Sequence, residues 1–267
     1  MLNKITQSQN CITIDEIGIS VPNPPNFGEF FFLGGIKSYK YFLNYVESKT
    51  VLDIGCGYGY GSYLMSWKAK QAIGIDLSKK VVETASNLYQ KDNLEFLLID
   101  AFNLKHKFPT AYFDVIIARE FIEHIKEPLE FLQIAHYLLS DEGMLILTTP
   151  NRLARGVDGK PWNPEHIREF DEISLRELLL QRFSDVRIIG MSGSEKVTAY
   201  DKIRTGGDTS PVFKKLWRYI PEIMKKPVRK LIVGKLPQDI TMDDFYFEDK
   251  VTSQSLSLVA FCKKLRV

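Results

Sequence analysis

The sequence predicts an α/β fold in which a doubly wound, mainly parallel sheet is covered by helices. The first observation is the segment 51–61, VLDIGCGYGYG, where a short apolar strand turns into a glycine-rich loop. The second is an alternation of strand and helix patterns that continues to residue 151. The third is the length of 267 residues, which suits one such domain with a small added subdomain.

The composition excludes few classes of binding partner, but it indicates the cellular compartment in which the protein works. With 45% hydrophobic residues and a formal net charge of +2, the chain is an ordinary globular protein without an overall field that favours nucleic acid. Cys11, Cys56 and Cys262 show no disulfide or metal spacing. No signal peptide and no apolar run of membrane-spanning length is evident. We therefore expect a cytoplasmic protein.

Residues 1–28 form an N-terminal arm that precedes the regular pattern. A weak alternation of apolar residues leads into the proline-rich sequence VPNPPN at 21–26, where we expect no regular element. The arm could serve as a lid or as a simple tether. The aromatic-rich segment 29–46 that follows has helical spacing, so core packing is the default explanation for its side chains.

The glycine-rich turn indicates a ligand, although it does not by itself identify one. Glycine permits torsions that other residues avoid and lets a ligand approach the backbone closely. Such turns hold dinucleotides, nucleotides or S-adenosylmethionine, but the dinucleotide fingerprint lacks its third glycine because position 60 is tyrosine. The next strand, 71–75, ends in Asp76, where an acidic residue can accept both hydroxyls of a ribose.

The remaining elements complete the alternation. Strand ends on the carboxyl side of a parallel sheet point into the ligand crevice, so Asp100, after the strand 94–99, is expected there. The other expected elements are a helix at 78–89 capped by Ser78, strands at 113–118, 142–151, 185–191 and 255–262, and an amphipathic helix at 174–183.

Three phrases in this order resemble the class I S-adenosylmethionine-dependent methyltransferases: D-x-G-x-G-x-G at 53–59, DVIIAREFIEHIKEPLEFL at 114–132 and GMLILTTPN at 143–151. The resemblance implies a Rossmann-like sheet of seven strands with an antiparallel last strand, built from residues 29–192 and 252–267. It implies S-adenosylmethionine as cofactor, and an aromatic residue such as Tyr39 or Tyr41 closing over it. The cofactor contacts that we expect are Asp53, Gly55, Cys56, Gly57, Gly59, Asp76, Leu77, Asp100, Ala101, Arg119 and Tyr41.

The pattern E-x-x-E-H at Glu120, Glu123 and His124 is the candidate catalytic centre, because one helical turn would bring all three side chains to one point. With His166 they would suit a divalent ion such as Mg²⁺, Mn²⁺ or Zn²⁺. The set resembles the metal site of small-RNA 2′-O-methyltransferases and ubiquinone-pathway O-methyltransferases. Alternatively, His124 is a general base without a metal, and His166 only holds its loop.

Residues 193–251 form an insertion too long for a simple hairpin, so we expect a substrate lid or subdomain. Its segment 214–235 carries eight basic residues against one glutamate. It could hold an anionic acceptor, rest on an anionic membrane that bears a lipid-linked glycan, or be a solvated helix.

We expect O-methylation of a small-molecule or glycan hydroxyl in a biosynthetic pathway. Nucleic acid is a less favoured partner because no RNA-binding module or overall basic surface is evident. The alternatives are an RNA 2′-O-methyltransferase and a cofactor-binding protein without catalysis. The sequence does not determine the oligomeric state.

Overall fold

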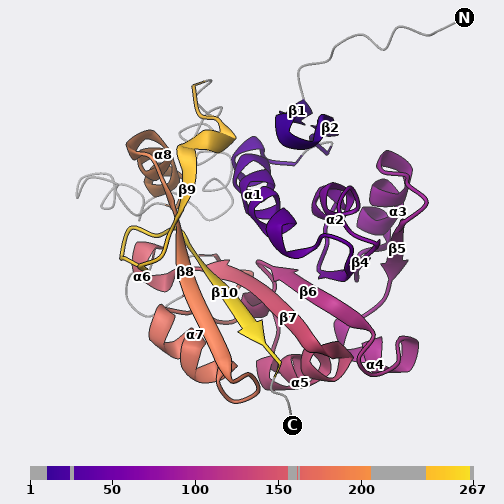
Figure 1. Cartoon of the computed structure of the whole chain (residues 1–267). Coiled ribbons are helices and arrows are strands. Elements are labelled where there is room, and N and C mark those ends of the chain that lie inside the picture. The colour runs from indigo at the N-terminus through magenta and orange to yellow at the C-terminus, as the bar shows by residue number, and fades with distance from the viewer. Residues whose placement is uncertain (1–10, 25–26, 156–160, 162, 206–238, 265–267) are drawn as a thin grey trace, which may run out of the picture.

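The computed structural model describes residues 11–24, 27–155, 161, 163–205 and 239–264, and Figure 1 shows their arrangement. A sheet of eight strands in the order β5-β4-β3-β6-β7-β10-β8-β9 forms its centre. The bounds are β3 Thr50–Ile54, β4 Gln71–Asp76, β5 Leu94–Leu98, β6 Phe113–Arg119, β7 Leu139–Pro150, β8 Asp185–Gly193, β9 Phe245–Glu248 and β10 Ser257–Lys263.

The sheet confirms the predicted doubly wound α/β fold. Strands β3 to β7 pair in parallel, whereas β10 runs antiparallel to both β7 and β8. The predicted seven strands are joined by an eighth, β9, which comes from the expected insertion and pairs antiparallel with β8. Its side chains alternate, because Phe245 is buried and Tyr246 is 44% exposed.

Helices cover both faces of the sheet (Figure 1). The α-helices are α1 Glu29–Phe42, α2 Tyr60–Met65, α3 Lys79–Leu88, α4 Leu104–Lys107, α5 Pro128–Leu138, α6 Arg152–Arg155, α7 Glu172–Leu179 and α8 Glu195–Thr205. Single 3-10 turns are η1 Asp15–Ile17, η2 Leu43–Tyr45, η3 Ala101–Asn103, η4 Ile122–His124 and η5 Met242–Asp244.

The core has two halves because successive side chains of a strand point to opposite faces. Val51, Val115 and Ile117 pack under α1 and α2, whereas Leu52 and Ile116 pack over α4, α5 and α7. Both faces are therefore buried, which explains why the strands read as continuous apolar runs.

The N-terminal arm contains a regular element that the sequence analysis excluded. Strands β1 Cys11–Ile14 and β2 Ile19–Pro22 pair antiparallel as a separate two-stranded sheet, with Cys11 opposite Pro22. The expectation that the prolines prevent regular structure was wrong at Val21 and Pro22, because a proline is tolerated at the end of a short edge strand. Tyr89 anchors the arm, since its hydroxyl donates to the Pro22 carbonyl at 2.7 Å.

Two further expectations concern membrane-spanning segments and the insertion 193–251. None of the helices in the described ranges is both long and apolar enough to cross a membrane. The basic segment 214–235 and most of the insertion 193–251 lie outside the described residues.

Candidate active site

The glycine-rich turn after β3 has the torsions that its sequence predicts. Gly55, Gly57 and Gly59 have φ angles of 68°, 53° and 81°, in the left-handed region. A Cβ at Gly59 would lie 2.6 Å from the Phe96 ring, and one at Gly55 would lie 2.9 Å from Phe121. A Cβ at Gly57 would meet nothing within 4 Å. Packing therefore requires two of these glycines, while the third borders open space.

Asp76, at the end of β4, ties the next strand to this turn. Its carboxylate accepts the backbone N–H of Gly57 at 3.1 Å and that of Ser78 at 2.9 Å. Ser78 is the N-cap residue of α3 as predicted, but its hydroxyl makes no capping hydrogen bond. The Asp100 carboxylate, after β5, accepts the backbone N–H of Phe102 at 2.9 Å. Both acidic side chains are thus oriented by neighbouring backbone groups.

A cavity of about 230 Å³ opens beside these carboxylates, and we call it the strand-end cavity. It is lined by Ile54, Gly55, Ile75, Asp76, Leu77, Ile99, Asp100, Ala101, Phe102, Glu120, Phe121, His124 and Ile125. Carboxylates on one side and apolar side chains on the other suit a nucleoside, whose ribose needs acceptors and whose base needs an apolar slot. The structure thus brings five of the predicted contacts together: Gly55, Asp76, Leu77, Asp100 and Ala101.

Asp53 and Cys56 lie behind the turn and do not line the strand-end cavity. The Asp53 side chain is 1% exposed and accepts hydrogen bonds from Ser62 Oγ at 2.6 Å and Tyr39 Oη at 3.0 Å. Burial raises the pKa of Asp53 to about 6, against the opposing effect of these hydrogen bonds. The Cys56 thiol is buried as well. Instead of the predicted cofactor contacts, both residues have supporting positions within the fold.

Tyr41 lies away from the strand-end cavity. Its ring packs on Phe247 of β9, with 4.3 Å between the ring centroids. It lines a different cavity, together with Lys37 and Lys40 of α1. This position contradicts the expected cofactor contact, because the last turn of α1 presents Tyr41 to β9 and not to the ends of the parallel strands.

A larger cavity of about 370 Å³, which we call the aromatic cavity, adjoins the first. Its polar lining is Arg119, Glu120, Glu123, His124, Asn163, Glu165, His166 and Ser257, and its other residues are Phe27, Phe30, Phe31, Gly34, Pro150, Met191, Phe245 and Leu256. Glu120 and His124 line both cavities. Two molecules bound in the two cavities would therefore meet at these side chains.

Glu120 does not belong to a helix, contrary to the one-turn arrangement predicted for E-x-x-E-H. It follows β6 with a φ of 49°, and η4 begins only at Ile122. Thr148 of β7 fixes it, because the Glu120 N–H donates to the Thr148 carbonyl at 3.0 Å and the Thr148 hydroxyl donates to Glu120 Oε1 at 3.1 Å. The left-handed residue turns the chain sharply off the sheet.

The Glu123 carboxyl group is fully buried. Its Oε2 accepts the Thr149 hydroxyl at 3.0 Å, whereas Oε1 has no hydrogen-bond partner among the described residues. Oε1 lies 3.9 Å from His124 Nε2. Burial raises the pKa of Glu123 above its ordinary value, and the nearby charge of Glu120 adds to this effect.

His124 has one ring nitrogen engaged and one available. Its Nδ1 lies 3.1 Å from the Glu165 carbonyl, which can only accept, so Nδ1 carries the proton in the neutral ring. Nε2 then has the lone pair. The side chain is 38% exposed. His124 is consequently placed to accept a proton from a molecule in the aromatic cavity.

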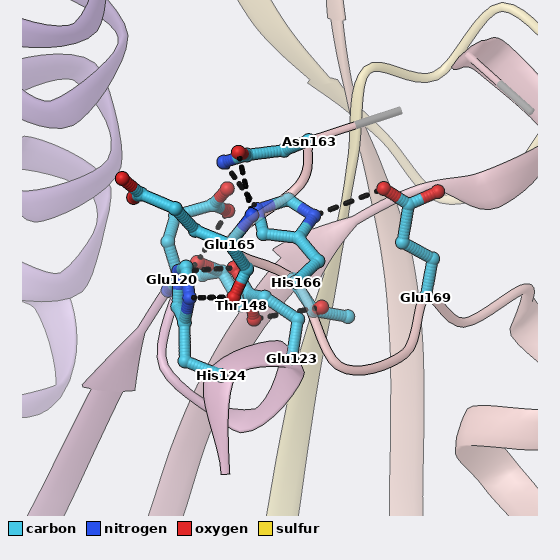
Figure 2. Close-up of polar contacts among 9 residues, drawn as sticks. Glu120, Glu123, His124, Thr148, Asn163, Glu165, His166 and Glu169 are labelled. Carbon is cyan, nitrogen blue, oxygen red and sulfur yellow. Dashed lines mark hydrogen bonds and ion pairs between the residues drawn. The ribbon is translucent and has the colours of Figure 1, made fainter. Parts of the chain in front are cut away.

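His166 is held between two side chains (Figure 2). Its Nδ1 lies 2.9 Å from Glu169 Oε1, and its Nε2 lies 3.0 Å from the Asn163 amide nitrogen. The Glu165 N–H donates to Asn163 Oδ1 at 3.1 Å and so fixes the orientation of that amide. Burial lowers the pKa of His166. A neutral ring that donates from Nδ1 and accepts at Nε2 satisfies every partner.

The predicted metal set is only partly assembled. One atom each of Glu123, His124 and His166 can be chosen so that all three lie within 4.8 Å of one another, but Glu120 does not belong to this group. The Glu123 carboxylate and His124 Nε2 fit a divalent ion, whose bonds to such ligands are about 2.0–2.2 Å. His166 could be a third ligand of such an ion only if the hydrogen bond between its Nε2 and the Asn163 amide were broken.

Sequence reasoning missed the residues that hold these groups in place. Asn163 and Glu169 stand three residues before and after the predicted His166, and this spacing within NPEHIREF was the available signal. Thr148 and Thr149 lie in the phrase GMLILTTPN, yet nothing in the sequence pairs them with Glu120 and Glu123. That pairing arises only because β6 and β7 are neighbours in the sheet.

Comparison with known proteins agrees with this geometry. The family model described as "Methyltransferase domain" matches residues 46–188. A probable S-adenosylmethionine-dependent methyltransferase of Mycobacterium tuberculosis is 31% identical over 163 residues, which are 60% of this chain and 57% of that protein. A ubiquinone biosynthesis O-methyltransferase of Pseudomonas paraeruginosa is 32% identical over 110 residues, 40% of this chain and 47% of that protein.

The chain spans about half the length of the curated relatives that it matches. Among solved structures, a methyltransferase from Archaeoglobus fulgidus, described as dependent on S-adenosylmethionine, superimposes with a TM-score of 0.56 and 17% sequence identity. The superposition covers 88% of this chain and 93% of the other. At this identity the likeness concerns the fold alone.

Proposed function

Because the chain belongs to the methyltransferase-domain family, we propose that it transfers a methyl group from S-adenosylmethionine to a hydroxyl group of a small acceptor. The observation that carries this proposal is the junction of the two cavities at Glu120 and His124. A nucleoside-sized cavity with acidic strand ends meets an aromatic cavity at a histidine with an available nitrogen. Donor and acceptor would face each other there.

The strand-end cavity holds the nucleoside part of the cofactor in this proposal. Asp76 accepts from the ribose hydroxyls, and Asp100 accepts from the adenine amino group. The open space at Gly57 admits a ligand close to the backbone. When bound, the cofactor supplies a methyl group that its sulfonium already activates, so the protein has to align the acceptor and remove its proton.

Arg119 is the candidate partner for the carboxylate at the methionine end. It lines the aromatic cavity, and its Nη1 lies 3.4 Å from the Tyr60 hydroxyl. No carboxylate of the described residues forms a salt bridge with its guanidinium. A guanidinium matches a carboxylate in shape as well as in charge.

The lining of the aromatic cavity favours an uncharged acceptor with an apolar body. Phe30, Phe31 and Phe245 supply flat apolar surfaces. Glu120 and Glu165 would repel an anion, and the one arginine of the lining, Arg119, is assigned to the cofactor carboxylate. A phenol fits both features. A glycan could also stack on the aromatic rings, but an anionic sugar or a lipid phosphate would face the glutamates.

His124 acts as the general base in this proposal. Its Nδ1 is held by the Glu165 carbonyl, so Nε2 can accept the proton that the hydroxyl loses. Glu123 Oε1 lies 3.9 Å from this nitrogen, and the buried carboxyl group would stabilise the imidazolium that forms. The glutamate and the histidine therefore work as a pair.

A divalent ion between Glu123 and His124 is the second candidate. The observation that favours it is Glu123 Oε1, a buried carboxylate oxygen that lacks a hydrogen-bond partner among the described residues. Such an ion would lower the pKa of a bound hydroxyl. The argument against a metal is that both ring nitrogens of His166 are already hydrogen-bonded, one to Asn163 and one to Glu169. We favour metal-independent transfer.

The proposal is tested by calorimetry with S-adenosylmethionine and its demethylated product, followed by transfer assays. The acceptor panel consists of catechols and simple phenols, neutral glycosides, sugar phosphates and RNA oligonucleotides. We expect cofactor binding, and transfer to phenols above the other classes. An absence of cofactor binding would overturn the proposal as a whole.

The same panel separates the alternatives. Salt-sensitive transfer to RNA would indicate a 2′-O-methyltransferase. Tight cofactor binding without transfer to any class would support a protein that binds the cofactor but does not catalyse. Turnover that is lost on chelation and restored by one divalent ion would replace the metal-independent mechanism.

A further inference from the structure

Tyr60 is the first residue of α2, and its hydroxyl accepts a hydrogen bond from Arg119 Nη1 at 3.4 Å. Within the described ranges, this is the only hydrogen bond that the Arg119 guanidinium makes. The Tyr60 side chain is 4% exposed and lines neither the strand-end cavity nor the aromatic cavity, whereas Arg119 lines the aromatic cavity. Tyr60 therefore reaches a bound molecule through Arg119 and not directly.

Three aromatic rings hold the Tyr60 ring in place. Phe32 and Tyr39 of α1 meet it nearly at right angles, with centroid distances of 5.2 Å and 5.7 Å, and the Phe27 ring lies 5.7 Å away. Edge-to-face pairs of this kind are favourable. Tyr39 is itself fixed, because its hydroxyl donates to the buried Asp53 carboxylate at 3.0 Å. The orientation of the Tyr60 ring is consequently set by its neighbours.

Gly35 of α1 provides the space that the Tyr60 hydroxyl occupies. Helices α1 and α2 lie side by side (Figure 1). A Cβ at Gly35 would lie 2.1 Å from Tyr60 Oη and 2.9 Å from its Cζ, which is far too close for atoms that are not bonded. A tyrosine at the start of α2 thus fits only because α1 has no side chain at this point.

The hydroxyl leaves the charge of Arg119 uncompensated. Burial raises the pKa of Tyr60, so the phenol keeps its proton at neutral pH and accepts from the guanidinium as a neutral group. No carboxylate of the described residues forms a salt bridge with Arg119. With Nη1 held by Tyr60, the planar guanidinium has its other N–H groups available for an anionic group in the adjoining cavity.

We propose that Tyr60 is a positioning residue that orients the Arg119 guanidinium for the carboxylate of the cofactor's methionine part. This role rests on the proposed function, because it takes S-adenosylmethionine as the methyl donor. A guanidinium that is already oriented loses less conformational entropy when the carboxylate binds. The benefit extends only to a ligand that carries this carboxylate, and a nucleoside without it gains nothing from Tyr60.

Two ligands that differ in the amino-acid part test the proposal by calorimetry on the full chain. S-adenosylhomocysteine, the demethylated product, carries the carboxylate, and 5′-methylthioadenosine retains the nucleoside and the sulfur but lacks it. Tyr60→Phe should weaken binding of S-adenosylhomocysteine about fivefold or more and leave that of 5′-methylthioadenosine within about twofold. Arg119→Met should weaken S-adenosylhomocysteine binding at least about tenfold, again with little effect on 5′-methylthioadenosine.

Tyr63→Phe is the matched control. It removes a hydroxyl from the same helix, and this hydroxyl makes no hydrogen bond within the described part of the chain. A double variant then separates positioning from general damage to the fold. If Tyr60 acts through Arg119, adding Tyr60→Phe to Arg119→Met should cause no further loss of S-adenosylhomocysteine affinity.

Equal affinities of Tyr60→Phe and the wild type for S-adenosylhomocysteine would overturn the proposal. A similar loss for both ligands would also overturn it, since the loss would then not involve the carboxylate. If the wild type binds 5′-methylthioadenosine as tightly as S-adenosylhomocysteine, the carboxylate is not held and the role of Tyr60 fails, while methyl transfer stands. Binding of neither ligand by the wild type would overturn the proposed function and this role with it.

Discussion

His124 Nε2 and Glu123 Oε1 face each other across 3.9 Å at the junction of two cavities. The distance is too long for a hydrogen bond. It leaves the lone pair of the histidine available while a buried carboxyl group remains close enough to stabilise a positive charge on the ring. The two residues are adjacent in sequence, and the 3-10 turn η4 places both side chains at the cavity.

Replacement of His124 by glutamine should lower kcat for methyl transfer about 100-fold or more, since general-base catalysis typically contributes about 10²–10⁴-fold. Cofactor affinity should change little, because this residue removes a proton from the acceptor. Steady-state kinetics and calorimetry measure the two effects. His106→Gln, an exposed histidine on α4, is the control. An unchanged kcat in His124→Gln would eliminate this residue as the base.

Asp76→Asn should weaken S-adenosylmethionine binding at least tenfold, because a charge-assisted hydrogen bond to the ribose is lost. The substitution keeps the shape of the side chain but leaves a single acceptor oxygen, whereas the Gly57 and Ser78 N–H groups donate to different oxygens of the carboxylate. Calorimetry measures the change, and the exposed Asp92→Asn serves as control. Equal affinities for the two variants would show that the ribose does not reach Asp76.

Alanine at two glycines of the turn should have different consequences. Gly59→Ala places a Cβ 2.6 Å from Phe96, so we expect a loss of about 3 kcal/mol or more in the free energy of unfolding. Gly57→Ala meets no neighbour within 4 Å and should cost only about 1–2 kcal/mol for its left-handed backbone.

The Gly57 variant should nevertheless lose cofactor affinity, because its Cβ enters space that the ligand needs. Urea unfolding and calorimetry on both variants test the contrast. Similar unfolding free energies for Gly57→Ala and Gly59→Ala would contradict the packing assigned to Gly59.

Asp53→Asn should change the pH dependence of stability. Burial raises the folded-state pKa of Asp53 from 3.8 to about 6, so the folded protein holds this proton more tightly than the unfolded chain does. The stability contribution of Asp53 is complete below about pH 4 and is lost as the pH rises to about 6.

Asparagine has no proton to lose there. The stability of the Asp53→Asn variant relative to the wild type should therefore increase by about 2 kcal/mol between pH 4 and pH 7, since one pKa unit corresponds to about 1.4 kcal/mol. Urea unfolding over this pH range, without cofactor, gives the difference. Asp92→Asn, at an exposed position, is measured alongside as the control.

Chelation tests the metal-independent mechanism. Exhaustive dialysis against a chelator should leave kcat within about twofold of its starting value, since His124 can remove the proton by itself. Glu123→Gln should lower kcat in both mechanisms, but only in the metal-dependent one should it also remove an activation by added divalent ions. Loss of turnover on chelation, with rescue by one ion only in the wild type, would establish the metal.

The sequence alone determined the succession of strands and helices along the central part of the chain and the character of the turn after β3. Both follow from local rules, because alternation of apolar side chains defines a strand and left-handed torsions require glycine. Asp76 and Asp100 could be placed at one edge of the sheet for the same reason, since the carboxyl ends of parallel strands share an edge.

Only the tertiary structure decided what each polar side chain contacts. Tyr39 and Ser62 donate hydrogen bonds to Asp53, and Tyr41 packs on β9. Asn163 and Glu169 hydrogen-bond to the two ring nitrogens of His166. These partners belong to different elements or to an irregular loop, whose path has no period in the sequence. Their positions depend on which segments the folded core brings together, so a motif could name candidate residues for this site but could not assign their roles.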